Sequence, residues 1–130
     1  EKLRRADVIV FQYPLYWYMT PSLMNKWIEK VFVHGFSHGS NGNALKDKVL
    51  IASLTTGAGE AAYSAETGTT IDELLAPIRL TAKLTQLNFV GHVVTHGVSY
   101  SLRNDAEKAQ EMIAKSQVHA KKLVEMIESL

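Results

Sequence analysis

The strongest constraint on the fold is a continuous apolar run, Val8–Phe11, which is followed by Pro14. A run without polar alternation is typical of a strand covered on both faces, as in a parallel sheet. Because proline has no N–H to continue a ladder, we expect the strand to span Val8–Tyr13 and to stop at Pro14. Glu1–Ala6 reads as the end of a helix that leads into this strand.

A helix is predicted directly after the aromatic loop Tyr16–Tyr18. Thr20 is a typical N-cap, and Pro21 is favoured as the first helical residue. Gly35 is expected to end the helix. One apolar face recurs at helical spacing, comprising Met24, Trp27, Ile28, Val31 and Phe32.

The same strand, loop and helix order occurs twice more. A second buried strand is predicted over Val49–Leu54 and a third over Phe89–Thr95. The small, polar loop Thr55–Gly59 follows the second strand, and Ala61–Gly68 is expected to be a loop. This alternation predicts an α/β fold with a parallel sheet, in which ligands bind at the carboxyl ends of the strands.

The two later helices have recognisable ends. Thr69 or Thr70 is expected to cap the first, with Thr69 and Asp72 at the spacing of a capping box, and Pro77 should kink or interrupt it. Asn104 or Asp105 is expected to cap the last helix. Its apolar positions are Ala109, Met112, Ile113, Leu123, Val124 and Ile127.

Composition excludes several classes of function. The 130 residues suffice for one domain, and a net charge of +1 without a basic stripe argues against nucleic acid as a partner. The absence of cysteine excludes disulfides and thiolate chemistry. No apolar run approaches the ~20 residues of a membrane span, and the first residues lack a secretory signal, so we expect no membrane insertion and a cytoplasmic location.

The histidines do not suggest a metal site. His34 and His38 are four residues apart, but they lack the H-E-x-x-H context of a zinc site, so no metal is expected. His92 and His96 are interpreted as structural, and His119 on the last helix has no obvious partner.

Neither loop is specific when taken alone. The aromatic residues after Pro14 are equally consistent with simple packing against the domain or a partner subunit. Thr55–Gly59 can direct several N–H groups into one concavity, but it is neither a P-loop nor a Rossmann G-x-G-x-x-G motif.

Together the two loops resemble the flavodoxin-like NAD(P)H:quinone oxidoreductases. The resemblance rests on Phe11–Trp17 continuing into Pro21–Phe32, and on Thr55–Gly57 with Tyr63. The bacterial branch is the most similar, including modulators of drug activity and ancillary reductases of potassium efflux systems. The implied fold is a flavodoxin-like three-layer sandwich whose parallel sheet has the strand order 2-1-3-4-5, of which this chain supplies strands 3, 4 and 5.

The resemblance also implies an activity. Such proteins bind FMN or FAD tightly but non-covalently, form homodimers, and transfer two electrons from NAD(P)H to quinones or similar acceptors by a ping-pong hydride mechanism. The alternatives are a regulatory or ancillary subunit of a potassium efflux transporter, and an inactive truncated remnant.

Site residues follow from the same resemblance. Cofactor contacts are expected from Pro14, Leu15, Tyr16, Trp17 and Tyr18 along one edge of the flavin ring, and from Thr55, Thr56, Gly57 and Ala58 on the N1–O2 side. Leu15 and Trp17 are expected to act largely through backbone groups. Tyr63 is the expected catalytic residue, as a hydrogen-bond donor to the charge that develops there.

Two departures from the family pattern stand out. The histidine that follows this tyrosine in the mammalian enzymes has no counterpart in Glu66–Thr70, so its proton relay is in doubt. The family domain also begins with a strand, a phosphate-binding loop, a helix and a second strand that have no counterpart before Glu1. We therefore expect residues 1–130 to be a single flavodoxin-like domain that lacks this N-terminal part, at least a ~30-residue piece.

Overall fold

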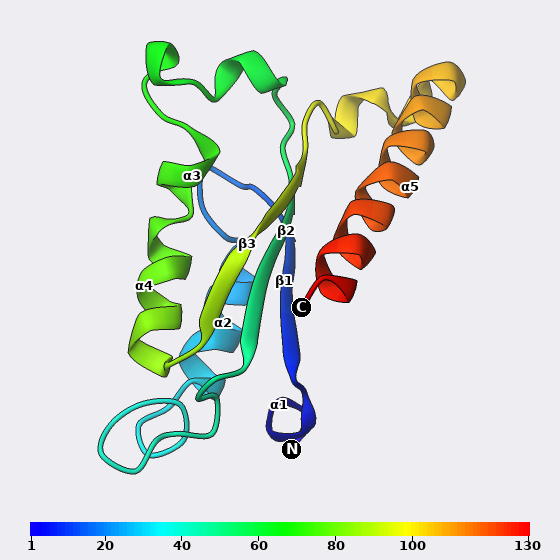
Figure 1. The fold of residues 1–130 in the computed structure, drawn as a ribbon. Helices are drawn as coiled ribbons and strands as arrows, with labels where there is room; N and C mark the ends of the chain where they lie inside the picture. Colours follow the sequence, from blue (N-terminus) through cyan, green and yellow to red (C-terminus); the bar gives the residue numbers. More distant parts are fainter.

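The computed structural model describes residues 1–130 and has one sheet of three parallel strands in the order β1-β2-β3 (Figure 1). The strands are β1 (Val8–Pro14), β2 (Val49–Thr55) and β3 (Asn88–Thr95). Pro14 pairs with Thr55, and Thr55 pairs with Thr95, so all three strands end at the same edge of the sheet. The predicted strands are confirmed to within one residue at each end.

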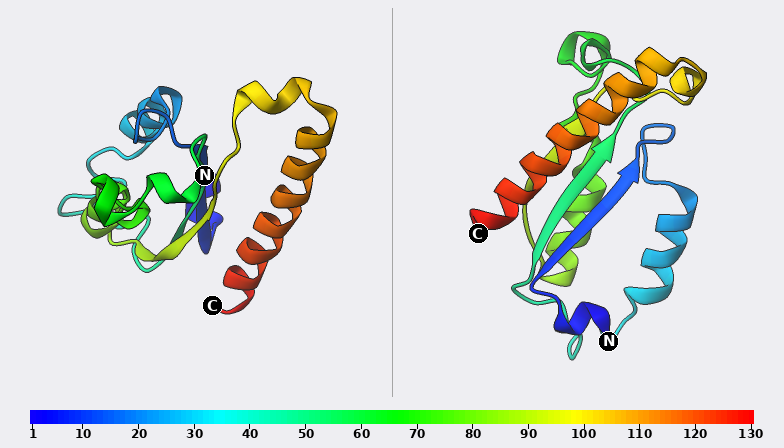
Figure 2. Two further views of the ribbon diagram at one scale, coloured as in Figure 1. Left: turned by 90° about the horizontal axis from the view of Figure 1, so that it is seen from above. Right: turned by 90° about the vertical axis from the view of Figure 1, so that its right-hand side faces the viewer.

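Helices cover both faces of the sheet, which gives the three layers expected (Figure 2). One face carries α2 (Ser22–Val31), α3 (Ile71–Leu74) and α4 (Ala76–Thr85), and the other carries α5 (Ala106–Glu128). The remaining helical segments are short: α1 (Lys2–Arg5) and the 3₁₀ turns η1 (Glu60–Ala62), η2 (Ala65–Thr67) and η3 (Tyr100–Asn104). No helix of the structure has both the length and the apolarity needed to cross a membrane.

The main hydrophobic core lies between the sheet and the α2–α4 layer. Alternate residues of β1 are buried there, and the Phe11 ring lies 6.2 Å from the Trp27 ring and 6.1 Å from the Phe32 ring. β2 is buried along nearly its whole length, with Leu50 fully inaccessible. In contrast, no residue of α5 is fully buried, so the second face of the sheet is packed less tightly.

Two expected helix boundaries were wrong. Pro21 itself is the N-cap of α2, because the Thr20 hydroxyl is hydrogen-bonded to the Asn25 side chain instead of capping the helix. The helix ends at Val31, and Gly35 lies beyond it in a turn with φ of 81°, where its N–H donates to His38. Ala61–Gly68, expected to be a loop, has no α-helix or strand and contains the end of η1 and the whole of η2.

The capping box of α3 is formed by Thr70 and Glu73, not by Thr69 and Asp72. The Thr70 hydroxyl accepts from the Glu73 N–H at 3.2 Å, and the Glu73 carboxylate accepts from the Thr70 N–H at 2.7 Å. The pKa of Glu73 is held below its ordinary value by hydrogen bonds that its carboxylate accepts from the Thr70 N–H, the Thr70 hydroxyl and the Thr69 hydroxyl. Pro77 interrupts the predicted helix as expected, since it lies in the first turn of α4 after the break from α3.

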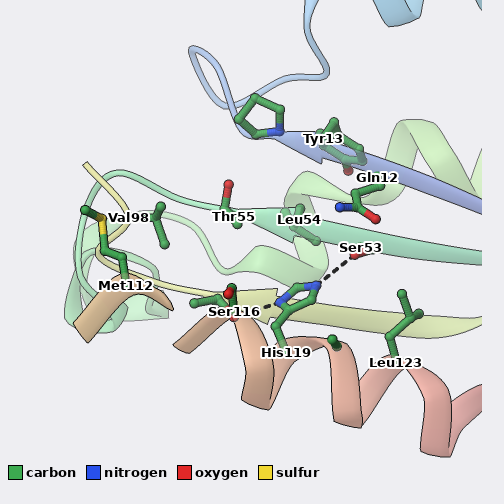
Figure 3. A pocket seen from close by; sticks show the side chains of 13 residues that line it. Gln12, Tyr13, Ser53, Leu54, Thr55, Val98, Met112, Ser116, His119 and Leu123 are labelled. Atoms are coloured by element: carbon green, nitrogen blue, oxygen red, sulfur yellow. Dashed lines mark hydrogen bonds between the residues drawn. The ribbon is translucent and has the colours of Figure 1, made fainter. Parts of the chain in front are cut away.

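The last helix begins as predicted but packs differently. The Asp105 carboxylate accepts from the Lys108 N–H at 3.1 Å and caps α5. Ile113 and Val124, expected on the apolar face, are each 50% exposed. Met112 and Leu123, which were expected on the same face, do lie toward the sheet and line a cavity between it and α5 (Figure 3).

Candidate functional site

The two predicted cofactor loops lie next to each other at the carboxyl edge of the sheet. The Leu15 N–H donates to the Thr55 carbonyl at 2.8 Å, which joins the aromatic loop to the end of β2. The Thr56 N–H in turn donates to the Thr95 carbonyl at 3.0 Å. The loops therefore continue the ladder of the sheet and are held together by its register.

The aromatic loop is a tight hairpin turn. Tyr16 and Met19 exchange N–H···O bonds of 3.0 and 2.9 Å, and the residues between them, Trp17 and Tyr18, have φ angles of 50° and 63°. Two positive φ angles define the type I′ class, which usually requires Gly or Asn. Bulky residues in this conformation are uncommon and concentrate at functional sites, where the surrounding structure holds them in place. The Trp17 side chain is 87% exposed.

In the glycine-rich loop after β2, Thr56 is buried and the residues that follow it are exposed. Thr56 is buried, and its hydroxyl donates to the Ala58 carbonyl at 2.8 Å, so its side chain shapes the turn instead of lying open to a ligand. Gly57 and Ala58 are exposed, and a Cβ added at Gly57 would meet no atom within 4 Å. Backbone at this position is open to the close approach of a ligand.

Both loops keep backbone donors without a partner. None of the hydrogen bonds in the structure uses the N–H of Trp17, Tyr18 or Gly57–Gly59. Of the two residues expected to act through their backbone, Leu15 already donates its N–H to Thr55, which leaves Trp17. Unpaired donors grouped at a sheet edge are suited to an anionic or carbonyl-rich planar ligand, so the residues present fit a flavin ring.

Four of the nine predicted cofactor contacts line two cavities. A cavity of about 410 Å³ between the sheet and α5 is bordered by Pro14 and Thr55 (Figure 3). A smaller one of about 170 Å³ on the α4 side is bordered by Leu15 and Tyr18. The larger volume lies in the range of small-molecule sites. The other five predicted contacts line neither of these two cavities: Tyr16, Trp17, Gly57 and Ala58 are exposed, and Thr56 is buried.

A histidine that had no obvious partner in the sequence links α5 to the sheet. His119 Nε2 is 2.8 Å from the Ser53 hydroxyl, and Nδ1 is 2.7 Å from the Thr95 hydroxyl (Figure 3). Burial lowers the pKa of His119, and the positive charge of Lys122 lowers it further. No sequence motif indicates this link, because the partners of His119 lie 66 and 24 residues away.

Tyr63 is half-buried and lies against His96, which was interpreted from the sequence as structural. Its ring stacks on the His96 ring, with centroids 5.5 Å apart and planes inclined by 28°. His96 Nδ1 is also 2.9 Å from the Thr56 hydroxyl. The structure thus groups the predicted catalytic tyrosine, the glycine-rich turn and a histidine from the end of β3.

Tyr13 is a further polar residue at this edge. It lines both cavities, and burial raises the pKa of its phenol to about 12. The hydroxyl therefore stays protonated throughout the physiological range.

Comparison with known proteins supports a common architecture. A family model described as "flavodoxin-like fold" matches residues 1–120. The glutathione-regulated potassium-efflux system ancillary protein KefF of Enterobacter sp. (strain 638) is 41% identical over 96 residues, which is 74% of this chain and 54% of that protein. The chain therefore spans just over half the length of this relative.

Two solved structures extend the comparison. General stress protein 14 from Treponema denticola, in complex with FMN, superposes with a TM-score of 0.79 at 28% identity and covers 94% of this chain and 67% of its own. An NADPH-quinone reductase from P. pentosaceus superposes with a TM-score of 0.71 at 27% identity, over 91% of this chain and 70% of its own.

Proposed function

This chain belongs to the family with the flavodoxin-like fold, and on that basis we propose that it is a flavin-dependent oxidoreductase acting on quinones or similar small acceptors. The observation that supports this most strongly is the pair of adjacent turns with unpaired N–H groups, in a chain similar to an FMN complex. When bound, the flavin would supply the redox chemistry, taking a hydride from NAD(P)H and passing two electrons to the acceptor in ping-pong order.

The chain's own residues would bind and orient the ring. Trp17 and Tyr18 would offer N–H groups along one edge, and Gly57 and Ala58 would offer them along another. Donors that are already in place stabilise developing negative charge without having to reorganise. Pro14 and Thr55 would border the ring on the α5 side, and the Tyr63 hydroxyl would add a donor.

The test is direct. The purified chain is titrated with FMN and with FAD, following the quenching of flavin fluorescence, and is then assayed for oxidation of NADH and NADPH with and without a quinone. Uptake of a flavin and quinone-dependent oxidation of either nucleotide are expected. A chain that is folded by circular dichroism but takes up neither flavin would refute the proposal and favour an inactive remnant.

A second candidate function rests on the similarity to KefF. The chain would then serve as an ancillary subunit of a potassium efflux system, retaining flavin without significant turnover. Co-purification with the membrane transporter, together with flavin binding and negligible quinone-dependent oxidation, would favour this function. Turnover without any such association would favour the enzyme.

A homodimer is proposed as the working assembly. The hairpin and the start of α2 expose a group of large apolar side chains that a second copy would cover. These are Tyr16, Trp17, Tyr18, Met19 and Leu23, each at least 59% exposed. Sedimentation equilibrium is expected to give twice the mass of 14.4 kDa. A monomer at all concentrations would contradict this assembly.

A further inference from the structure

The segment that follows β3 braces the glycine-rich turn from one side. The Gly97 N–H donates to the Ala58 carbonyl at 2.9 Å, and the Val98 N–H donates to the Thr56 carbonyl at 2.8 Å. These bonds extend the pairing of β2 and β3 past the ends of both strands. The turn that bears the unpaired donors is therefore shaped by residues about 40 positions further along the chain.

The hydrogen bonds around Thr56 assign the tautomer of His96. The single proton of the Thr56 hydroxyl is donated to the Ala58 carbonyl at 2.8 Å. In the 2.9 Å contact with His96 Nδ1, the hydroxyl oxygen must therefore accept, and Nδ1 must carry a proton. In the neutral ring, Nε2 is then left with the lone pair.

His96 thus has two different contacts through two parts of its ring. The Nδ1–H bonds Thr56, and the ring face stacks on Tyr63 with centroids 5.5 Å apart. The backbone of His96 is held as well, because its carbonyl accepts from the Lys115 ammonium group of α5 at 3.2 Å. His96 therefore joins the turn after β2, the Tyr63 segment and α5 at one point.

We propose that His96 is a positioning residue for the candidate site. Through Nδ1–H it fixes the Thr56–Ala58 turn in the form that leaves the N–H groups of Gly57 and Ala58 unpaired. The effect on flavin binding rests on the proposed function, whereas the effect on the turn does not. This assigns a site role to a histidine that lies well outside Glu66–Thr70, where the mammalian relay histidine would be expected.

Two substitutions separate the two contacts. In His96→Asn the amide nitrogen takes the place of Nδ1 and keeps the donor to Thr56, but the ring is lost. In His96→Phe the ring is kept for stacking on Tyr63, but the donor is lost. Both are compared with the wild-type chain, and thermal unfolding by circular dichroism verifies that each variant is folded.

Three measurements follow. Long-range ¹H–¹⁵N NMR of the wild type is expected to show His96 protonated at Nδ1, and this requires no variant. Amide exchange at Gly97 and Val98 is expected to accelerate about tenfold in His96→Phe and to change little in His96→Asn, since one hydrogen bond is lost only in the former. FMN affinity is expected to fall about tenfold in His96→Phe and by less than about threefold in His96→Asn.

The role of His96 can be refuted separately at the turn and at the flavin. A wild-type His96 protonated only at Nε2, or equal acceleration of amide exchange in both variants, would overturn the positioning role. An FMN affinity that is unchanged in both variants would overturn the claim that His96 supports flavin binding. If the wild type binds no FMN, the proposed function fails, but the NMR and exchange results still test whether His96 fixes the turn.

Discussion

Replacing Gly57 by valine separates ligand binding from folding. An added Cβ meets no atom within 4 Å, and the residue has no positive φ that a side chain would strain. We therefore expect the free energy of unfolding to change by no more than about 0.5 kcal/mol, as at other open surface positions.

The effect on flavin binding is expected to be much larger. A valine side chain would occupy the space through which a flavin edge approaches the Gly57 N–H. A hydrogen bond to a charged group contributes roughly 1.5–3 kcal/mol, so its loss predicts between about tenfold and a hundredfold weaker binding of FMN.

The assay is fluorescence titration with FMN, paired with urea unfolding of the same samples. Gly59→Val is the matched control, because Gly59 also has open space and an extended backbone (φ −71°, ψ 167°). Its N–H is unpaired as well, but it lies outside the predicted contacts Thr55–Ala58 and is not one of the donors proposed to bind the ring. It should leave affinity within about threefold, well below the loss expected for a charged hydrogen bond. Equal losses of affinity and stability in Gly57→Val, or no loss of affinity, would show that Gly57 serves only the turn.

Three further predictions concern stability. Burial lowers the pKa of His92 and His119 below 6.5, so below that pH the unfolded chain binds protons that the native chain does not. The free energy of unfolding is therefore expected to be highest above pH 6.5, to fall as the pH drops through that value, and to level off below the native pKa values. Urea melts between pH 8 and 5 measure this, and a His119→Gln variant with an unchanged slope would contradict it. Thr70→Ala removes the cap of α3 and should lower the free energy of unfolding by about 1 kcal/mol in thermal melts, where no change would contradict the capping box. Leu50→Ala should lower it by about 2–5 kcal/mol, against less than about 0.5 kcal/mol for Leu84→Ala on the surface of α4, and similar values for both would contradict the assigned core.

The positions of the strands were predictable because their signal is local, whereas their order in the sheet came from the family resemblance. Val8–Phe11 and Val49–Leu54 are apolar runs that admit little besides buried parallel strands, and their carboxyl ends then had to share one edge. Helix ends were less predictable, since Thr20 and Thr70 both have capping chemistry and only the fold shows which hydroxyl reaches an N–H.

The parts that escaped prediction depend on contacts between distant residues. His119 and His96 reach Ser53 and Thr56 across 66 and 40 residues, and nothing near either histidine in the sequence indicates a hydroxyl partner. The exposure of Ile113 on α5 has the same origin, because helical spacing predicts that a stripe is apolar but not how closely it meets the sheet.

The strained backbone of the hairpin at Trp17 and Tyr18 costs free energy during folding and not during ligand binding. Both left-handed residues are already fixed by the paired bonds between Tyr16 and Met19 in the free chain. The disfavoured backbone geometry therefore lowers the stability of the apoprotein. A planar ligand binds to a loop that is already ordered, so binding has no further entropic cost of ordering it. Glycine at these two positions would relieve the strain, and would therefore raise the free energy of unfolding and weaken ligand binding.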